Sequence, residues 1–531
     1  MSGFSVSIFA AAARTWRALV AVCALAVIAA CGCAPRAVVL TPDQQPVIDR
    51  RIIEYPAGTE LRLYIQGLTA PTAMTFDRDG ALIIAEGGAG GYEPRIVAFR
   101  PDGTTAEIYP GGQRLPLHIE RVVGLEKFRL YGPVGGLAAA HGRIYVSHRD
   151  ASGRGVITAF GYDGSRATIV ADLPAQGDHG VTDIAVAPNG RLYFGVGTAT
   201  NSGVVGNDNL HWLRYHRHVC DKPWGDLYLL GRRFDTVNPF GGLLGGPDLA
   251  VTAPFQPYGT SIETRIPHAS NGKPNGAIYS VDPSGGDLRV EAHGLRNPAG
   301  LGFSEAGVLY MTNQGMKLRG TRPVKDDPDV MLRLVNGQWY GWPDYSANLL
   351  PIRDARFQPP VELIVKTGYR DLSFLIDHES SGLVPPNPNS NLLAAEFKPL
   401  AGACKFAFAP ASGPFSRLRQ AGNVAIVALM GDRAPFDTSG LKLVGPTGYR
   451  VVQANVDDRQ VRDFIRNTRE WPASRIGEPA ALERPVDVKF GPDGAMYILD
   501  LGRMDVKGGR ERVKAGTGRV FRLVGVDASR Q

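Results

Sequence analysis

The chain has 531 residues, of which 44% are hydrophobic and 21% are charged, and its formal net charge is +7 at pH 7. This composition excludes a disordered or collagen-like chain and provides enough apolar residues for a sizeable core. Lysine and arginine are spread along the sequence without a basic run, so we expect no binding of nucleic acid.

The first thirty residues predict an export signal. Arg14 and Arg17 precede the apolar run "ALVAVCALAVIAA", residues 18–30, which is too short to span a bilayer. The run ends in "IAAC", which resembles a bacterial lipobox, so we expect removal of residues 1–30 and lipidation of Cys31. The mature chain would then be a periplasmic or cell-envelope lipoprotein, attached to the membrane by its lipid. Cleavage by the ordinary signal peptidase is the alternative, and it would leave a soluble protein.

Residues 31–49 are expected to form a linker that precedes a single domain, residues 50–525. Three cysteines follow the candidate lipidation site: Cys33, Cys220 and Cys404. A disulfide between Cys220 and Cys404 is compatible with export, but the sequence alone does not pair the cysteines.

One short pattern recurs six times between residues 76 and 502. Each copy is a strand, a tight turn containing glycine, and a second strand that is apolar at nearly every position; the glycine supplies the positive φ that such turns need. The turn glycines are Gly80, Gly142, Gly190, Gly307, Gly413 and Gly494. A strand that is apolar on both faces lies between two sheets. The repeats therefore predict an all-β fold, a six-bladed β-propeller with long inter-strand loop insertions.

A wide gap between Gly190 and Gly307 holds an insertion, residues 204–273, which we expect to be mostly loop. It contains four potential zinc or copper ligands close together in sequence: His211, His216, His218 and Cys220. A basic aromatic loop without metal is the alternative. In that case the mouth of a substrate site could be lined by Trp212, Tyr215 and Trp224.

Two polar pairs precede predicted inner strands, where propeller loops converge on the central channel. In "AQGDHGVTDIAV", the imidazole of His179 can take a proton from a substrate hydroxyl, and the adjacent Asp178 could raise its basicity. In "GLRNPAGLGF", the guanidinium of Arg296 suits a carboxylate or a developing oxyanion, and Asn297 offers a donor and an acceptor. The alternatives are a solvent-exposed histidine and an arginine that braces neighbouring loops.

Two further stretches carry candidate ligands. Exposed carbonyls together with Asp326, Asp327 and Asp329 could hold a hard cation such as calcium. The nearby "WYGWP" could form a stacking platform, although packing between blades is the alternative for its tryptophans. Arg484 enters the last hairpin in "LERPVDVKFGPDG", where a surface ion pair of little energetic value is the alternative.

The order of these motifs resembles that of the glucose/sorbosone dehydrogenase family, whose best-understood members are soluble pyrroloquinoline-quinone (PQQ) sugar dehydrogenases. The chain has, in order, "DHG…APNGRLY", "GLRNPAGLGF…LYMTNQG", "GQWYGWPDY" and "RPVDVKFGPDGAMYILD". The likeness covers most of residues 63–523. It implies the same six-bladed propeller that the hairpins predict.

The resemblance also implies roles for the matching residues. His179 would be the catalytic base with Asp178 beside it, and Arg296 would lie near the quinone carbonyl that receives the hydride. The backbone carbonyls of Gly315 and Met316 would hold the Ca²⁺ of the cofactor. The remaining quinone contacts would be Asn297, Gln314, Arg433 and Arg484. Arg433 would replace a family lysine, and Val486 stands where the family has a second arginine.

These roles predict a dehydrogenase that oxidises a sugar or polyol hydroxyl with PQQ and Ca²⁺. The electrons would leave to an acceptor that the sequence does not identify. Two alternatives stay open. A metal-dependent lactonase would need a channel cation, for which Glu86, Asn201 and Asp500 are candidate ligands. A lipid-anchored binding propeller would perform no chemistry, because the fold alone does not fix the function.

Overall fold

The computed structural model describes residues 37–111, 116–238, 248–262, 267–270, 272–363, 372–441, 445–507 and 510–526. The expected signal segment, Cys31 and Cys33 lie outside these residues. Within the described ranges, every helix is too short or too polar to cross a bilayer.

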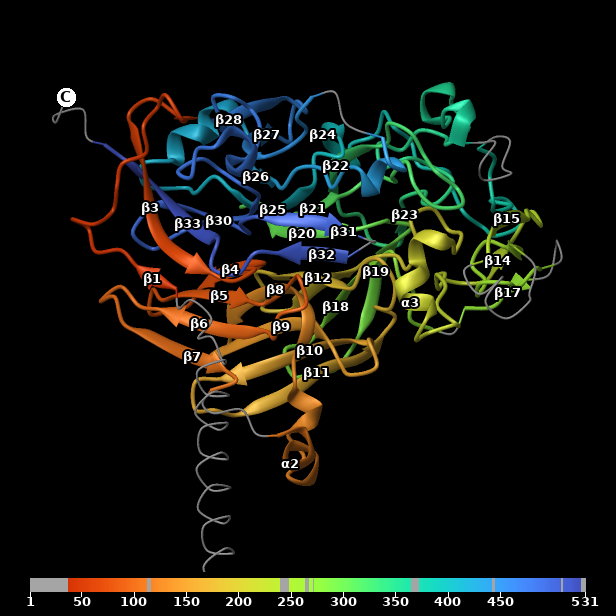
Figure 1. Cartoon of the computed structure of the whole chain (residues 1–531), viewed down its shortest axis with the longest axis horizontal. Helices are drawn as coiled ribbons and strands as arrows, with labels where there is room; N and C mark the ends of the chain where they lie inside the picture. The colour runs from red at the N-terminus through yellow and green to blue at the C-terminus, as the bar shows by residue number, and fades with distance from the viewer. Residues whose placement is uncertain are drawn as a thin grey trace, which may run out of the picture. The chain divides into compact units, whose positions relative to one another are not determined.

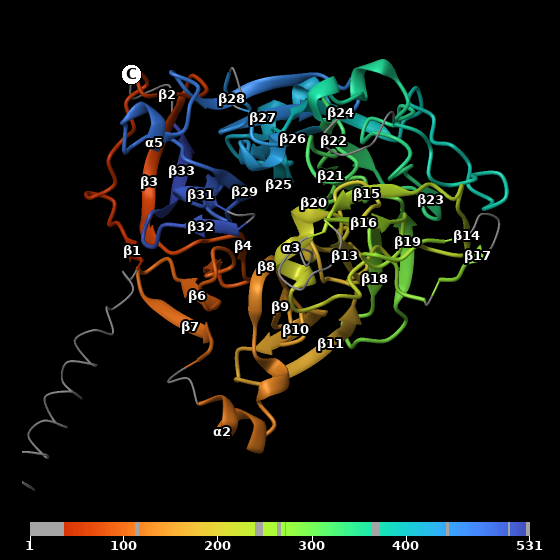
Figure 2. The same ribbon diagram turned by 45° about the vertical axis from the view of Figure 1, so that its right-hand side comes forward.

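Six sheets follow one another around a ring, and each contains one of the repeated hairpins (Figures 1 and 2). Their innermost strands contact one another in succession: β4 (Ala73–Phe76), β8 (Tyr131–Ala140), β12 (Val181–Val186), β20 (Pro298–Phe303), β25 (Ala403–Phe408) and β29 (Pro485–Phe490). The six turn glycines adopt φ values from 68° to 85°, a region that costs other residues free energy. The prediction of an all-β, six-bladed propeller with one hairpin per blade is confirmed.

The first two blades are four-stranded antiparallel sheets. Blade 1 contains β4, β5 (Leu82–Glu86), β6 (Arg95–Phe99) and β7 (Thr105–Tyr109). Blade 2 contains β8, β9 (Arg143–Arg149), β10 (Gly155–Gly161) and β11 (Arg166–Leu173). Two short helices connect them, α2 (Leu117–Val122) and η1 (Glu126–Phe128).

The next two blades are larger or more irregular. Blade 3 contains β12, β13 (Leu192–Val196), β18 (Ala277–Val281), β19 (Arg289–His293) and the parallel strand β23 (Gln338–Trp339). Blade 4 contains β20, β21 (Leu309–Asn313), β22 (Pro328–Arg333) and β24 (Leu393–Pro399). The connection from β23 to β24 includes η3 (Ala355–Phe357).

The last two blades take strands from the N-terminal part of the described chain: one in blade 5 and two in blade 6. Blade 5 contains β25, β26 (Val424–Leu429), β27 (Arg450–Asn455), β28 (Val461–Asn467) and β2 (Ile53–Glu54). Blade 6 contains β29, β30 (Met496–Asp500), β33 (Gly518–Gly525), β3 (Thr59–Leu68) and β1 (Val38–Val39). Residues 38 and 39 pair with β3, so the ordered sheet reaches back into the expected linker. The connecting helices are η4 (Ser416–Ala421), η5 (Phe436–Thr438) and α5 (Ala473–Ile476).

The second strand of each hairpin is buried on both faces, as its composition predicts. All six residues of β26, "VAIVAL", are buried, because neighbouring blades pack against both sides of the sheet. Between blades 5 and 6, for example, Ile426 and Ile465 pack in one apolar cluster with Ile498 and Phe521. This face-to-face packing replaces a single central core.

The insertion at residues 204–273 is irregular over most of its described residues, as expected, but it also holds short regular elements that the sequence did not indicate. It contains η2 (Asn207–Asn209), α3 (Leu210–Leu213) and two small antiparallel sheets. The sheets pair β14 (Leu227–Tyr228) with β17 (Pro267–His268), and β15 (Phe234–Val237) with β16 (Leu249–Thr252). The strands are short, and the alternating burial of β15 spans only four residues, so the period is too brief to detect in the sequence.

Cys220 and Cys404 are free thiols, so the disulfide between them is not formed. Cys220 packs in the insertion against Val205 and Leu213. Cys404 lies in the inner strand β25, against the cores of the last two blades. The two cysteines therefore belong to different packing units.

Candidate active site

Three predicted residues lie where inner strands begin. His179 precedes β12, Asn297 precedes β20, and Arg484 precedes β29. The Thr198 N–H donates to the carbonyl of Arg296 at 2.8 Å, and the Thr198 carbonyl lies 3.1 Å from Nδ1 of His179. His179 and Arg296 therefore lie at the same mouth of the channel.

Gly197 separates His179 from Asn297. A Cβ atom at Gly197 would lie 2.4 Å from the Cβ of His179 and 3.0 Å from Oδ1 of Asn297, so this close approach requires glycine. Asn297 donates through Nδ2 to Oε1 of Gln314 at 3.0 Å, and Gln314 donates to the Ala403 carbonyl at 3.0 Å. The hydrogen-bonded side chains of Asn297 and Gln314 thus link the blade 3 side of the site, through blade 4, to the first residue of β25.

His179 is held as a neutral imidazole. The Thr198 carbonyl can only accept a hydrogen bond, so Nδ1 carries the proton and Nε2 keeps its lone pair. Burial, followed by the cations of Arg296, Arg319 and Arg433, holds the pKa of His179 well below its ordinary value. At neutral pH the ring is therefore unprotonated at Nε2 and able to accept a proton.

Asp178 does not assist His179 as predicted. Its carboxylate accepts a hydrogen bond from Nδ2 of Asn209 at 2.9 Å and pairs with Nη2 of Arg319 at 2.5 Å. The carboxylate contacts these groups because the insertion and the loop after β21 both place donors beside it. The expected rise in the basicity of His179 is replaced by a lowered pKa.

Arg296 is buried and aligned by Asn201. Its side chain is 1% exposed; Nε donates to the Asn201 carbonyl at 3.0 Å, and Nη2 donates to Oδ1 of Asn201 at 3.1 Å. Nη1 is also buried and has no hydrogen-bond partner among the described residues. Burial, followed by the charge of Arg319, lowers the pKa of Arg296 to about 10, so it is still a cation at neutral pH.

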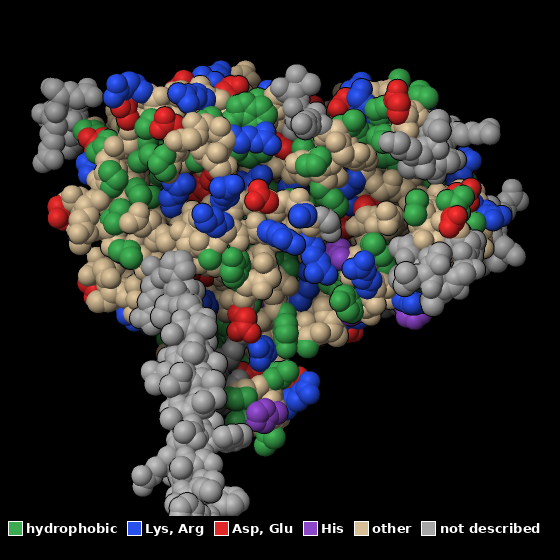
Figure 3. Space-filling view, in the orientation of Figure 1, with side chains coloured by type: hydrophobic (Ala, Val, Ile, Leu, Met, Phe, Trp, Pro, Cys, Tyr) green, Lys and Arg blue, Asp and Glu red, His purple; other side chains and the backbone are tan. Residues whose placement is uncertain are grey.

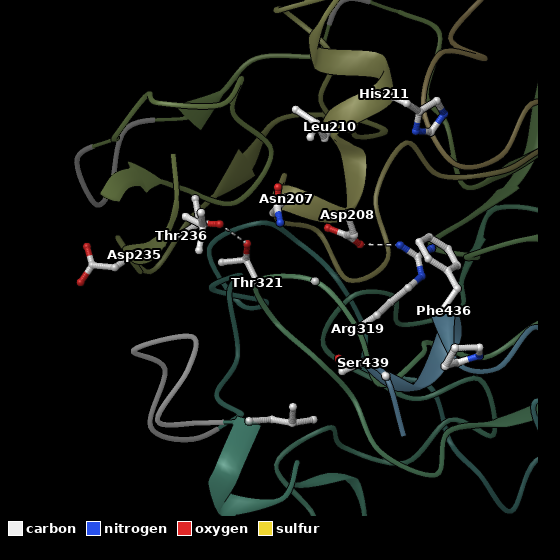
Figure 4. Close-up of a pocket in the computed structure, with 15 residues that line it drawn as sticks. Asn207, Asp208, Leu210, His211, Asp235, Thr236, Arg319, Thr321, Phe436 and Ser439 are labelled. Atoms are coloured by element: carbon white, nitrogen blue, oxygen red, sulfur yellow. Dashed lines mark hydrogen bonds and ion pairs between the residues drawn. The ribbon is translucent and has the colours of Figure 1, made fainter. Parts of the chain in front are cut away.

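Arg319 is the centre of an ion cluster over this mouth. It pairs with Asp178 and with Asp208, its Nε lies 3.5 Å from Asp437, and its guanidinium lies 4.9 Å from the ring centre of Phe436. Figure 4 shows Arg319 between Asp208 and Phe436, with His211 nearby on α3. Burial raises the pKa of Asp208 to about 6, even though Arg319 opposes the shift. The cluster connects the insertion to blades 4 and 5.

Arg433 forms ion pairs instead of leaving its charge free. It pairs with Asp437 at 3.3 Å and with Glu511 of the ribbon formed by β31 (Met504–Lys507) and β32 (Arg510–Val513) at 2.8 Å. Asp437 first and then Glu511 raise the pKa of Arg433. Burial opposes ionisation of Asp437, but the neighbouring cations, Arg433 first, lower its pKa to about 2.

Arg484 is directed to backbone carbonyls. Nη1 donates to the carbonyl of Asp432 at 2.9 Å, and the guanidinium lies 5.2 Å from the ring centre of Tyr449. The adjacent Gly431 donates to the carbonyl of Ala401, just before the strand that Gln314 contacts. Arg484 therefore lies at this mouth, one loop away from Asn297 and Gln314. Among the described residues Arg484 has no ion-pair partner, so the surface ion pair considered from the sequence is not observed.

The predicted set Asp326, Asp327 and Asp329 does not converge on a cation. Asp327 accepts the amide hydrogens of Met316 and Ala347, and burial raises its pKa to about 7. Asp329 accepts the amide of Gly315 at 3.0 Å, whereas Asp326 is exposed. These two buried carboxylates instead fix the Gly315–Met316 backbone. The carbonyls of Gly315 and Met316 accept no hydrogen bond from any residue in the described ranges.

Other candidate metal sites also fail to form. The described part of the chain contains no group of three histidine, cysteine or carboxylate side chains placed to hold a metal ion. His216 lies 3.3 Å from Nε2 of Gln176, and Cys220 accepts a hydrogen bond from Lys222. Of the lactonase candidates, Glu86 and Asp500 accept backbone amides, and Asn201 holds Arg296. In "WYGWP", both tryptophans are buried in an apolar cluster, as packing between elements predicts.

Two clefts open beside the ion cluster. One has a volume of about 590 Å³ and is drawn in Figure 4; its lining includes Asp235, Thr236 and Thr321. The other has a volume of about 840 Å³ and lies between the insertion and the β31–β32 ribbon, with Asp178 in its wall. His211, Arg319 and Phe436 line both clefts and separate them.

Comparison with solved structures gives similar folds at low sequence identity. A carbohydrate-active enzyme of family AA12 from Trichoderma reesei and the holo form of the pyranose dehydrogenase PQQ domain from Coprinopsis cinerea each align with a TM-score of 0.50 and 14% identity. Each alignment covers 90% of this chain and 98% of the other. This chain has their fold. No family model and no curated protein matches the sequence.

Sequence reasoning missed the residues that build the ion cluster and the support of Arg296. These are Thr198, Asp208, Arg319, Phe436 and Asp437; Asn201 was considered only as a metal ligand, not as the support of Arg296. The only usable signal was position. Arg319 lies three residues after the "NQGM" stretch, and Asp208 lies in the polar stretch "GNDN" in the insertion between β13 and β18. Neither stretch has a spacing that indicates a partner.

Proposed function

We propose that the protein is a quinoprotein-like dehydrogenase that oxidises a hydroxyl group of a sugar or polyol. The observation that supports this function is the convergence of His179, Arg296 and Asn297 at one mouth of the channel. His179 offers an unprotonated Nε2, and Arg296 offers a buried Nη1 without a partner. A base and an oriented cation are the two groups that hydride abstraction from an alcohol requires of the protein.

The residues at this mouth suit a quinone that carries carboxylates. Nη1 of Arg296 is a buried donor without an acceptor, and the cation of Arg484 lies one loop away at the same mouth. The amides of Asn297 and Gln314 would contact the same ligand. The free carbonyls of Gly315 and Met316 are hard oxygen donors of the kind that Ca²⁺ prefers. We therefore propose PQQ and Ca²⁺ as the cofactors.

The chain supplies proton transfer and charge stabilisation. When bound, PQQ would act as the acceptor of the hydride. His179 would remove the hydroxyl proton through Nε2 while the Thr198 carbonyl holds the ring by Nδ1. Arg296, fixed by two hydrogen bonds to Asn201, would stabilise negative charge without having to reorganise.

Cofactor binding can be measured without a substrate. Titration of the purified protein with PQQ in the presence of Ca²⁺ should give saturable quenching of tryptophan fluorescence, and chelation of Ca²⁺ should weaken it. Arg296→Gln should lower the affinity for the quinone about 10–100-fold, because it removes charge-assisted hydrogen bonds. Arg503→Gln, at an exposed position, is the matched control and should have no effect.

The outcome separates the dehydrogenase from a binding propeller. The loaded protein should reduce an artificial electron acceptor when an aldose or polyol is added. If neither PQQ binding nor acceptor reduction is observed, the dehydrogenase proposal is wrong and a non-catalytic binding propeller is favoured.

We also propose that the protein is exported and anchored by lipid at Cys31, as the "IAAC" sequence indicates. In a bacterial host, Cys31→Ser should move the protein from the membrane fraction to the soluble fraction or stop its maturation. Cys33→Ser is the matched control and should not change the fractionation. A Cys31→Ser protein that is processed normally and stays with the membrane would show that the lipobox interpretation is wrong.

A further inference from the structure

We propose that the 840 Å³ cleft binds an anionic sugar, one that carries a carboxylate or a phosphate, through Arg149, Arg510 and Arg512. This inference rests on the proposed function and specifies its class of substrate. Asp178 and Gly177, which directly precede His179 in the chain, line this cleft, so a sugar bound there would lie close to the segment that carries the candidate base.

The cleft has more positive charge than its own carboxylates can neutralise. It is lined by six arginines: Arg129, Arg149, Arg319, Arg433, Arg510 and Arg512. Three of them are engaged, because Arg129 pairs with Glu93 and Glu120, and Arg319 and Arg433 belong to the ion cluster. In the described part of the chain, Arg149, Arg510 and Arg512 have no ion-pair partner; the Arg149 side chain donates only to backbone carbonyls. Figure 3 shows lysine and arginine side chains gathered over the ribbon and toward α3.

The guanidinium of Arg149 is held in place by the backbone, so it offers a fixed site for an anion rather than a mobile surface charge. It is 8% exposed, and its fork is fixed by hydrogen bonds from Nε to the Ala175 carbonyl at 2.8 Å and from Nη2 to the Gly177 carbonyl at 3.2 Å. Trp212 lies against its guanidinium at 4.8 Å. Nη1 has no hydrogen-bond partner among the described residues. Burial lowers the pKa of Arg149 to about 10, so a buried, unneutralised cation remains at neutral pH.

The aromatic groups of the cleft favour a sugar over a small free anion. Trp212 and Tyr215 line it from the insertion, and Phe436 lines it from η5. The Tyr215 side chain is 75% exposed, an unusual position for a large ring unless a ligand covers it. Arg510 and Arg512 lie on the opposite ribbon, so a ligand that spans the cleft can place a ring on the aromatics and an anionic group on the arginines.

The anion is distinct from the cofactor proposed above. Arg296 and His179 do not line this cleft, whereas Arg149, Arg510 and Arg512 do, and Arg433 is the one proposed quinone contact in its wall. A quinone held by Arg296 would leave Arg149, Arg510 and Arg512 without an anion. The substrate is the remaining ligand that can supply one.

Binding to the quinone-free protein tests this inference. Isothermal titration should detect glucuronate or glucose 6-phosphate at least about tenfold more tightly than glucose, with an affinity that falls as salt is added. The double variant Arg510→Gln/Arg512→Gln should lower the affinity for the anionic sugars about tenfold or more. Arg149 is left intact because it fixes the Ala175–Gly177 backbone.

A matched control lies on the same ribbon. Lys507→Gln/Lys514→Gln removes the same charge from exposed positions that do not line the cleft, and it should leave the affinity unchanged. An equal loss of affinity in both double variants would overturn the proposal. It would show that the sugar responds only to the overall positive charge of this surface and not to contacts with Arg510 and Arg512.

Four other results would overturn it as well. The first two are equal affinity for glucose and glucuronate, and no binding of any of the three sugars. The third is sulfate binding as tight as that of the anionic sugars. The fourth is displacement of the sugar by PQQ, with the same dependence on Arg510 and Arg512. Failure of the proposed function has a different signature: the protein would bind the anionic sugar but show no binding of PQQ.

Discussion

Replacement of His179 by asparagine should lower the turnover of the quinone-loaded protein about 10²–10⁴-fold, because it removes the group that takes the substrate proton. Asparagine can still donate a hydrogen bond to the Thr198 carbonyl, which is the bond that Nδ1 of the imidazole makes. The affinity for the quinone should therefore change little. Steady-state turnover and quinone titration of the same preparation measure the two effects separately.

The pH dependence provides a second readout for His179. Its pKa is held well below the ordinary value, and the base acts only when it is unprotonated. Turnover should therefore remain on its plateau at pH 6.5 and fall only as the pH drops through the lowered pKa. The matched control is His118→Asn, at an exposed position on α2. Equal, mild losses in both variants, or an acidic limb centred at pH 6.5, would contradict the assignment of His179 as the base.

Replacement of Arg319 by methionine should destabilise the fold by about 3–5 kcal/mol, because three largely buried carboxylates would lose a shared cation. Asp208 already has a raised pKa of about 6, and removal of Arg319 should raise it further. A carboxyl group whose pKa is higher in the folded state than in the unfolded state contributes stability at low pH and loses it as the pH rises. The loss of folding stability caused by Arg319→Met should therefore be larger at pH 8 than at pH 5.

Denaturant unfolding of the parent and the variant at both pH values measures this deficit. The double variant Asp208→Asn/Arg319→Met removes one of the stranded charges, so it should recover part of the lost stability at pH 8. An Arg319→Met protein that unfolds at the same denaturant concentration as the parent would show that the cluster does not stabilise the fold.

The fold was predictable because its determinants are local. In the first hairpin, Oδ1 of Asp77 accepts the amides of Asp79 and Ala81, and Gly80 takes the positive φ that closes the turn. All these interactions fall within five consecutive residues. Six copies of such a turn, each followed by an apolar strand, leave few arrangements other than blades around an axis.

The site could be predicted only in part, because its electrostatics depend on distant partners. Asp178 and Arg319 are 141 residues apart, and nothing in either segment indicates the other. Adjacency in sequence suggested that Asp178 would act on His179, but the carboxylate binds Arg319, so the pKa of His179 moves in the opposite direction. The position of His179 and Arg296 at one mouth was predictable, since both precede inner strands. The charged groups that surround these two residues were not predictable from the sequence.

Pairing of β3 with β33 has a consequence for the order in which the protein acquires its structure. Leu61 lies opposite Leu523, with the rest of the ring between them in sequence, and Figure 2 shows the two strands side by side. During synthesis at ~5–20 residues per second, β3 waits for its partner for roughly tens of seconds. Until then the edge of an apolar strand is open to pairing with other chains. An exported chain would meet this hazard before the ring closes, so chaperones that shield strand edges should matter more for its yield than for its final stability.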